Sequence, residues 1–340
     1  MRSLRNFFCL CLIGVSTALC AQQYKVASRL SFPGDAGWDY LFADSESRRL
    51  YVSHGNEVEV VDLDSQKPVG KISGLNRIHG IAVADDLNRG FISDGGANEV
   101  VVFDTKSRAE LQRVKTGTNP DGIVYDAPSQ RVFAFNGRSQ DATVIDAATG
   151  AVAGTIALGG KPEFPVSDGK GSLYVNIEDK SEIVKINSKT MRVENRWPLA
   201  PCEEPSGLAI DRSSDRLFSV CSNQKMAVVD AASGKVVTTV PIGNGPDAVA
   251  FDPERKLVFS SNGQDGTLTI IKEESADVFS VMETDTTEKS ARTLALDSKM
   301  HSLYLSAAQF GAPPAATGDN PHPRPKIVPG SFHVLIVSPR

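Results

Sequence analysis

The stretch PDGIVYDAPSQRVFAFNGRSQDATVIDAATGAVAGTIAL, residues 120–158, contains four short apolar segments separated by polar turns. The segments are rich in Val, Ile, Phe and Tyr and are bounded by Gly, Pro, Asn and Asp, which is typical of β-strands. The turn DAATGAV between the third and fourth segments places Gly150 where a tight hairpin requires a positive φ. The stretch therefore predicts one unit of four antiparallel strands.

This unit recurs along the chain. Seven opening segments align, and each ends in Asp or its equivalent: WDYLFAD (38–44), IHGIAVA (78–84), PDGIVYD (120–126), PEFPVSD (162–168), PSGLAID (205–211), PDAVAFD (246–252) and ARTLALD (291–297). Their second residues are separated by 40, 42, 42, 43, 41 and 45 positions, so the period is near 42 residues. Seven repeats of four strands predict an all-β fold, a seven-bladed β-propeller with four antiparallel strands per blade.

The last repeat contains only three strands. The N-terminal segment YKVASRLSF (24–32) has the character of a fourth strand, and we expect it to pair beside residues 332–337. The last blade is then closed by the N-terminal strand, which removes an exposed sheet edge. On this interpretation residues 22–340 form a single propeller domain.

Composition and charge limit the partners. The 28 Gly and 19 Pro residues supply turns, and 41% hydrophobic residues supply a large core. The 36 Lys and Arg residues are outnumbered by 41 Asp and Glu residues, for a net charge of −5. This balance disfavours bulk binding of nucleic acid or anionic lipid, and we expect a monomer with no transmembrane segment.

Residues 1–21 have the pattern of a signal peptide. Arg2 and Arg5 precede an apolar run over residues 7–18, and small residues at Cys20 and Ala21 suit cleavage there. A buried N-terminal helix and a lipid anchor at Cys20 are the alternatives. Export predicts a periplasmic or secreted protein.

Two cysteines remain after such a cleavage. Cys202 and Cys221 would then face an oxidising compartment, which favours a disulfide over two unrelated buried thiols. The mature net charge would be −7, from 34 basic and 41 acidic residues.

One equivalent residue per blade is expected at the mouth of the central channel, because the first strand of each propeller blade lines that channel. We call this set the mouth residues: Asp39, His79, Asp121, Glu163, Ser206, Asp247 and Arg292. Carboxylates brought this close raise one another's pKa or recruit a cation, and both are typical of functional sites. The alternative for Asp121 and Asp247 is a structural one, in which Asp after Pro caps a turn.

The ends of the second strands reach the same face and add His54 and Glu178 to the candidate ligand-binding residues. Histidine and carboxylate together suit a divalent metal, with His54, His79 and Glu163 as candidate ligands, although no HxxxH or CxxC spacing enforces a metal site. The alternative is that these are solvated loop histidines. No cofactor is expected beyond such a metal.

Blade 7 contains a Pro-rich insertion over residues 307–330, which is too rich in proline for regular strand or helix. It leaves the blade on the mouth side. We expect it to be a lid or a partner-docking loop that brings His322 over the channel mouth, with a tolerated surface insertion as the alternative.

The chain also resembles the YVTN-repeat β-propellers, which include exported YncE-like proteins. The segment RLYVSHGNEVEVVD (49–62) is similar to the pattern that names this family, and the likeness covers nearly the whole mature chain. The resemblance implies the propeller architecture but no single activity. The insertion in blade 7 departs from the family pattern.

The chain contains no GxSxG, GxxxxGK[ST], HExxH or EF-hand loop. The leading hypothesis is therefore an exported propeller that binds a small polar ligand or a protein loop at the channel mouth. The alternative is a metal-dependent hydrolase or lyase of the lactonase kind, with Glu163 or His79 as the acid or base at the same mouth.

Overall fold

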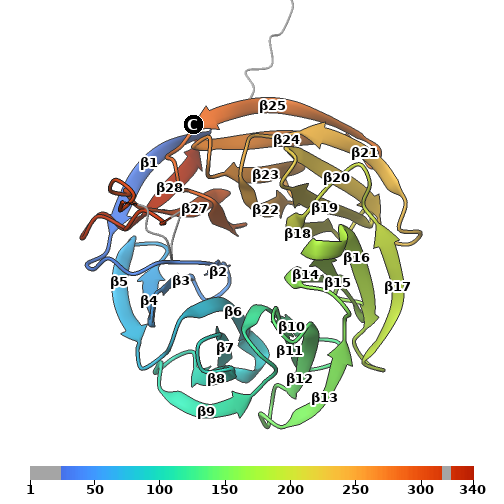
Figure 1. Cartoon of the computed structure of the whole chain (residues 1–340), viewed down its shortest axis with the longest axis horizontal. Coiled ribbons are helices and arrows are strands. Elements are labelled where there is room, and N and C mark those ends of the chain that lie inside the picture. Colours follow the sequence, from blue (N-terminus) through green and yellow to red (C-terminus); the bar gives the residue numbers. More distant parts are fainter. Residues whose placement is uncertain (1–23, 316–322) are drawn as a thin grey trace, which may run out of the picture.

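The structure is a computed structural model that describes residues 24–315 and 323–340. The described chain forms seven four-stranded antiparallel sheets arranged as blades around a central channel (Figure 1), which confirms the seven-bladed propeller. The inner strand of each blade lies at the centre of the disc and the fourth strand at its edge. No helix in these two ranges is long and apolar enough to cross a bilayer.

In blades 1 to 6 the four strands follow one another in chain order from the inside outward. Blade 1 consists of β2 (Leu41–Asp44), β3 (Arg49–His54), β4 (Glu57–Asp62) and β5 (Lys67–Ile72). Blade 2 consists of β6 (Ile78–Ala84), β7 (Arg89–Asp94), β8 (Glu99–Asp104) and β9 (Glu110–Lys115). Blade 3 consists of β10 (Pro120–Asp126), β11 (Arg131–Asn136), β12 (Asp141–Asp146) and β13 (Val152–Ala157). Blade 4 consists of β14 (Pro162–Ser167), β15 (Ser172–Ile177), β16 (Glu182–Asn187) and β17 (Arg192–Pro198). Blade 5 consists of β18 (Pro205–Asp211), β19 (Arg216–Cys221), β20 (Lys225–Asp230) and β21 (Val236–Pro241). Blade 6 consists of β22 (Pro246–Asp252), β23 (Leu257–Asn262), β24 (Thr267–Ser275) and β25 (Val278–Thr286). Two single-turn 3₁₀ helices, η1 (Asp85–Leu87) and η2 (Glu178–Lys180), lie in turns.

Blade 7 is built from both ends of the described chain. It consists of β26 (Thr293–Asp297), β27 (Ser302–Ala307), β28 (His333–Pro339) and β1 (Tyr24–Ser31). Strand β1 pairs antiparallel with β28, from Tyr24 opposite Pro339 to Ser31 opposite His333. The predicted closure by the N-terminal strand is confirmed, and Figure 1 shows the blue β1 beside the red β28.

The hydrophobic core is divided among the gaps between blades. Each of seven clusters of buried apolar side chains joins two neighbouring blades; the cluster between blades 7 and 1, for example, combines Phe332 and Val334 with Leu50 and Val61. Most of the apolar area is therefore buried by contact between repeats, and no blade is expected to be stable alone.

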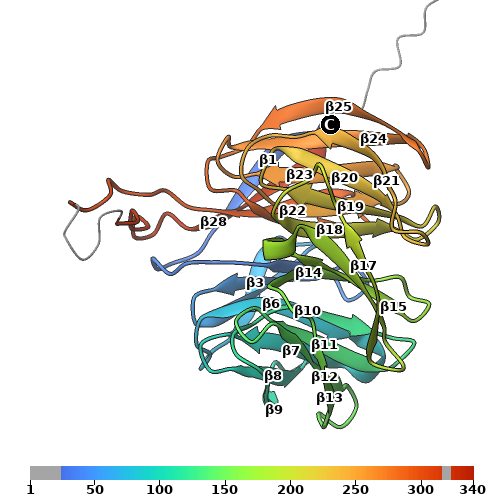
Figure 2. The same ribbon diagram turned by 45° about the vertical axis from the view of Figure 1, so that its right-hand side comes forward.

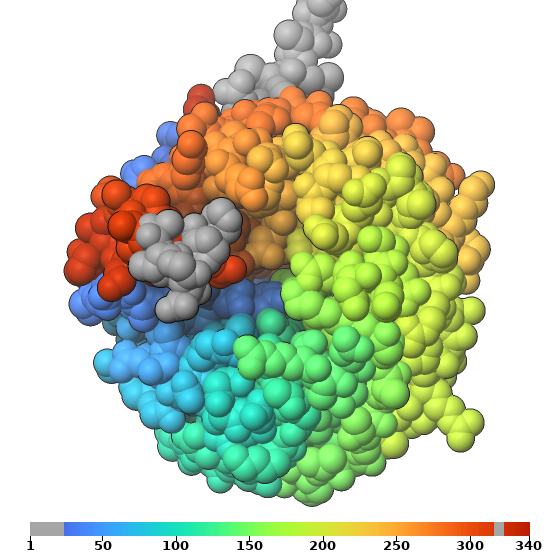
Figure 3. Space-filling model, viewed as in Figure 1, coloured from blue at the N-terminus to red at the C-terminus, as the bar shows by residue number. Residues whose placement is uncertain are grey.

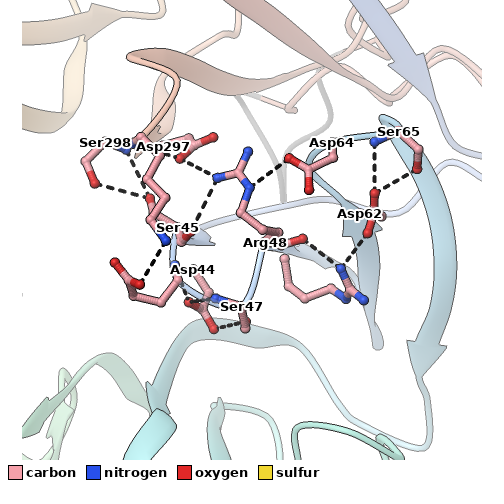
Figure 4. A network of polar contacts seen from close by, with 12 residues as sticks. Asp44, Ser45, Ser47, Arg48, Asp62, Asp64, Ser65, Asp297 and Ser298 are labelled. Atoms are coloured by element: carbon pink, nitrogen blue, oxygen red, sulfur yellow. Dashed lines mark hydrogen bonds and ion pairs between the residues drawn. The ribbon is translucent and has the colours of Figure 1, made fainter.

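Blades 7 and 1 are also joined by polar contacts at the face opposite the channel mouth (Figure 4). Arg48 donates through Nη1 to Asp297 and through Nε to Asp64, both at 2.8 Å. The backbone N–H of Ser298 donates to the Ser45 hydroxyl at 3.0 Å. Because the Asp297 side chain is fully buried, its charge needs this partner.

Candidate functional site

The mouth residues lie where the seven inner strands begin. In blades 2 to 6 the mouth residue is the second residue of the inner strand. In blade 7 Arg292 directly precedes β26, and in blade 1 Asp39 lies two residues before β2. The disc is hollowed at its centre (Figure 3). Contacts between side chains join six of the seven mouth residues into three clusters, described next, while the Ser206 hydroxyl donates to the Pro246 carbonyl at 3.2 Å.

The first cluster centres on His79. Its Nδ1–H donates to Asp39 at 2.6 Å, and the same nitrogen lies 3.7 Å from an Asp121 oxygen. Burial lowers the pKa of His79, but the hydrogen bond to Asp39 and the two carboxylate charges outweigh it, so the pKa is raised. His79 Nε2 is buried and has no hydrogen-bond partner among the described residues.

Asp121 is affected by the same crowding. Burial and the charge of Asp39 raise its pKa to about 6, against the opposing effects of His79 and Lys161. Only 15% of its side chain is exposed. An additional positive charge in the mouth would therefore stabilise the ionised form of the Asp121 carboxyl group.

The second cluster contains Arg292 and Asp247. The two side chains form an ion pair, and Arg292 Nη2 lies 3.7 Å from an Asp39 oxygen and donates to the Trp38 carbonyl at 3.2 Å. Burial raises the pKa of Asp247, and Arg292 only partly opposes this rise. Asp39 thus belongs to both clusters and links them.

The third cluster contains Lys161, Glu163 and Glu178. Lys161 Nζ lies 2.7 Å from a Glu163 oxygen and also forms an ion pair with Glu178 of η2. Burial and the charge of Asp121 raise the pKa of Glu163 to about 8, even with Lys161 in contact. At neutral pH this side chain is therefore mainly a protonated acid.

Two aromatic side chains close the inner end of this polar site. Tyr40 and Phe164 meet with ring centroids 5.0 Å apart, although they come from blades 1 and 4. We call them the aromatic pair. Burial, followed by the charges of Asp121, Glu163, Asp39 and Asp247, raises the pKa of Tyr40 well above its usual value.

The sequence prediction missed Lys161 and the aromatic pair. Lys161 directly precedes the inner strand of blade 4. The sequence pattern around it does not indicate which way its side chain points. The aromatic pair did leave a signal: the third residue of the opening segment is Gly80, Gly122, Gly207, Ala248 and Thr293 in five blades, and an aromatic residue in the other two.

The remaining predicted residues lie elsewhere. The His54 ring stacks on Phe332 with centroids 4.2 Å apart, and burial lowers its pKa. No contact with His79 is found for it within the described ranges. His322 lies outside the described residues. The parts of the insertion that are described leave blade 7 on the mouth side and project from the disc (Figure 2), and Phe310 packs on Trp38 with centroids 6.0 Å apart.

Cys202 and Cys221 form the predicted disulfide, with Cα atoms 5.7 Å apart. The bridge joins the segment before β18 to the end of β19. Both cysteines are buried in the core between blades 4 and 5.

One group of mouth residues has the spacing of a metal site. Asp39, His79 and Asp121 each offer one ligand atom, and these atoms lie within 4.8 Å of one another. One imidazole and two carboxylates form a donor set that suits a divalent transition metal. Of the metal ligands predicted from sequence, His79 belongs to this group, while His54 and Glu163 do not.

Comparison with solved structures identifies the fold only. The chain is similar to a chain of hydrazine synthase from Kuenenia stuttgartiensis, with 17% identity, a TM-score of 0.69, and coverage of 80% of this chain and 92% of that one. It is also similar to U3-55K (8% identity, TM-score 0.75, coverage 91% and 97%) and to the RRP9 WD40 repeats (9% identity, TM-score 0.76, coverage 92% and 97%). No protein-family model and no curated protein matches the chain. The protein is thus a seven-bladed β-propeller with WD40-repeat propellers among its structural neighbours.

Proposed function

We propose that this protein is an exported propeller of the YVTN-repeat kind that binds a small polar ligand at the channel mouth, and that the bound part of the ligand carries a positive charge. Residues 1–21 would act as the signal peptide and residues 22–340 as the mature propeller domain. The resemblance of residues 49–62 to the YVTN pattern and the buried disulfide support export.

The charge balance of the mouth carries the proposal. Five carboxylates (Asp39, Asp121, Glu163, Glu178 and Asp247) surround two permanent cations (Lys161 and Arg292) and His79. The mouth is therefore short of positive charge whether His79 is protonated or neutral. Burial is the first cause of the raised pKa values of Asp121 and Glu163, and the charge of a neighbouring carboxylate adds to it, as expected where negative charge is in excess.

A cation that binds should displace protons. Glu163, with a pKa of about 8, holds a proton at neutral pH and would release it when an ammonium group approaches. Binding should therefore tighten as pH rises toward 8, with up to about one proton released per ligand. A protein loop that presents a lysine would use the same chemistry.

Calorimetric titration with 1,4-diaminobutane tests the proposal. Run in two buffers with different ionisation enthalpies, it measures the proton released on binding. Asp121→Asn should weaken binding, whereas Glu254→Gln, which removes a charge from an exposed side chain on the opposite face, should not. Equal binding by both variants and the unmodified protein would refute a cation site at the mouth.

The second candidate is a metal-dependent hydrolase or lyase, favoured by the spacing of Asp39, His79 and Asp121. These residues would hold the metal, which would polarise a substrate oxygen, while Glu163 would donate a proton. His79→Ala separates the two candidates. It should abolish Mn²⁺ binding if the site holds a metal, but should preserve or strengthen diamine binding, because it removes a competing positive charge.

A further inference from the structure

A second hollow lies in the central channel beyond the aromatic pair. We call it the axial cavity; its volume is about 280 Å³. Its walls come from the inner strands of blades 1 to 4 and include Phe42, Ile81, Val83 and Val124. The aromatic pair forms its end toward the mouth, so the polar site and this apolar cavity share one partition.

The opposite end of the axial cavity carries polar groups. Because the inner strands run away from the mouth, Tyr125 and Arg212, near or just after the ends of their strands, lie at the far face. The Tyr125 hydroxyl donates to Asp86 at 3.0 Å. Arg212 donates through Nε and Nη2 to the Ser167 carbonyl, at 3.2 and 2.9 Å, while its Nη1 makes no hydrogen bond to the described residues.

We propose that the axial cavity is a separate binding site for a small aromatic acid, with the ring system among the apolar walls and the carboxylate at Arg212. An engineered cavity of about 150 Å³ with similar walls accommodates one benzene ring, so a cavity nearly twice as large suits a two-ring body. Apolar walls with a few polar groups at one end are the usual form of a small-molecule site.

Arg212 determines which polar group of the ligand can bind at the far end of the axial cavity. A guanidinium with a donor to spare binds a carboxylate by a charge-assisted hydrogen bond. A further hollow of about 440 Å³, lined by Val166, Leu208 and Phe251 among others, adjoins on the other side of Arg212 and leaves room for a substituent. This site uses none of the charged mouth residues, so it does not depend on cation binding there.

The experiment is a titration with 2-naphthoate and with indole, which has two rings but no acid group. Both should bind with one-to-one stoichiometry. Arg212→Gln should lower the affinity for 2-naphthoate about tenfold, because it removes one charge-assisted hydrogen bond, and should leave the affinity for indole unchanged. The Arg212 side chain belongs to an exposed residue, so this variant should fold.

Two further variants locate the site. Val124→Phe fills the cavity and should abolish binding of both compounds, while Asp121→Asn, at the mouth, should leave both unchanged. If Val124→Phe fails to fold, a crystal soaked with 2-naphthoate should show the rings between Tyr40 and Arg212. The proposal is wrong if neither compound binds, if both bind equally well to Val124→Phe, or if the soaked compound lies at the mouth.

Discussion

Replacing Glu163 with Gln should make the stability of the protein less dependent on pH. Glu163 is 14% exposed, contacts Lys161 and is affected by the charge of Asp121. Its pKa is raised from 4.5 to about 8, first by burial and then by Asp121. Gln has nearly the same shape and polarity as the protonated acid but cannot ionise, so the substitution isolates the titration.

The sign of the effect follows from the raised pKa. Between 4.5 and about 8 the folded protein holds a proton that the unfolded chain has lost, so the free energy of unfolding falls as pH rises through this window. The shift corresponds to at most about 5 kcal/mol, at 1.36 kcal/mol per pH unit. Water at the open mouth screens these charges, and we therefore expect a loss of about 2 kcal/mol that the Gln variant does not show.

Urea denaturation from about pH 5 to about pH 9 measures this difference. The two proteins should be about equally stable at the acid end, and the Gln variant should be more stable at the alkaline end. Glu178→Gln is the matched control, because Glu178 also contacts Lys161 but is more exposed, at 32%. Parallel curves for Glu163→Gln and the unmodified protein, or an equally flattened curve for Glu178→Gln, would refute the reasoning.

Three more outcomes are expected. Replacing Cys202 and Cys221 with Ala should lower the free energy of unfolding by about 3 kcal/mol, measured against the oxidised protein in urea; equal midpoints would show that the bridge adds nothing. Deleting Tyr24–Ser31 should expose the edge of β28 and cause aggregation, visible by size-exclusion chromatography, and a soluble monomer with native circular dichroism would contradict this expectation. Asp85→Asn should stabilise the protein at neutral pH by up to about 1 kcal/mol and have little effect near pH 4, because partial burial and then the charge of Asp44 raise the pKa of Asp85 to about 6. Thermal melts at the two pH values check the difference, and an equal shift at both would count against it.

The fold could be predicted because the same four-strand pattern repeats seven times in the sequence, with the N-terminal segment supplying the last strand. A single four-strand unit is ambiguous, but a period near 42 residues leaves few architectures, and the missing fourth strand of blade 7 identified the role of the N-terminal segment. The period also selected the mouth residues, because equivalent positions in a closed ring converge on its axis. The structure brings six of them into contact with one another or with Lys161.

The arrangement of individual side chains could not be predicted in this way. The direction of the His54 ring depends on Phe332, which reaches it only after blades 7 and 1 have packed together. Lys161 lies outside the aligned segments, and its backbone is held by η2: its N–H donates to the Asp179 side chain and its carbonyl accepts from the Glu178 N–H. Both are consequences of contacts between segments far apart in the chain, about which a local pattern carries no information.

The third position of the opening segment explains why the channel has a polar and an apolar part. In blades 2, 3 and 5 this position faces the next blade at close range. A Cβ on Gly80 would lie 2.9 Å from the Asp121 carbonyl oxygen, one on Gly122 would lie 2.6 Å from the Glu163 carbonyl oxygen, and one on Gly207 would lie 2.8 Å from the Ala248 backbone. Packing between blades therefore demands small residues there. Tyr40 and Phe164 depart from this pattern, and their rings contact each other and line the axial cavity. In a repeat protein the consensus satisfies the fold, so the positions that depart from it are the ones to examine for function.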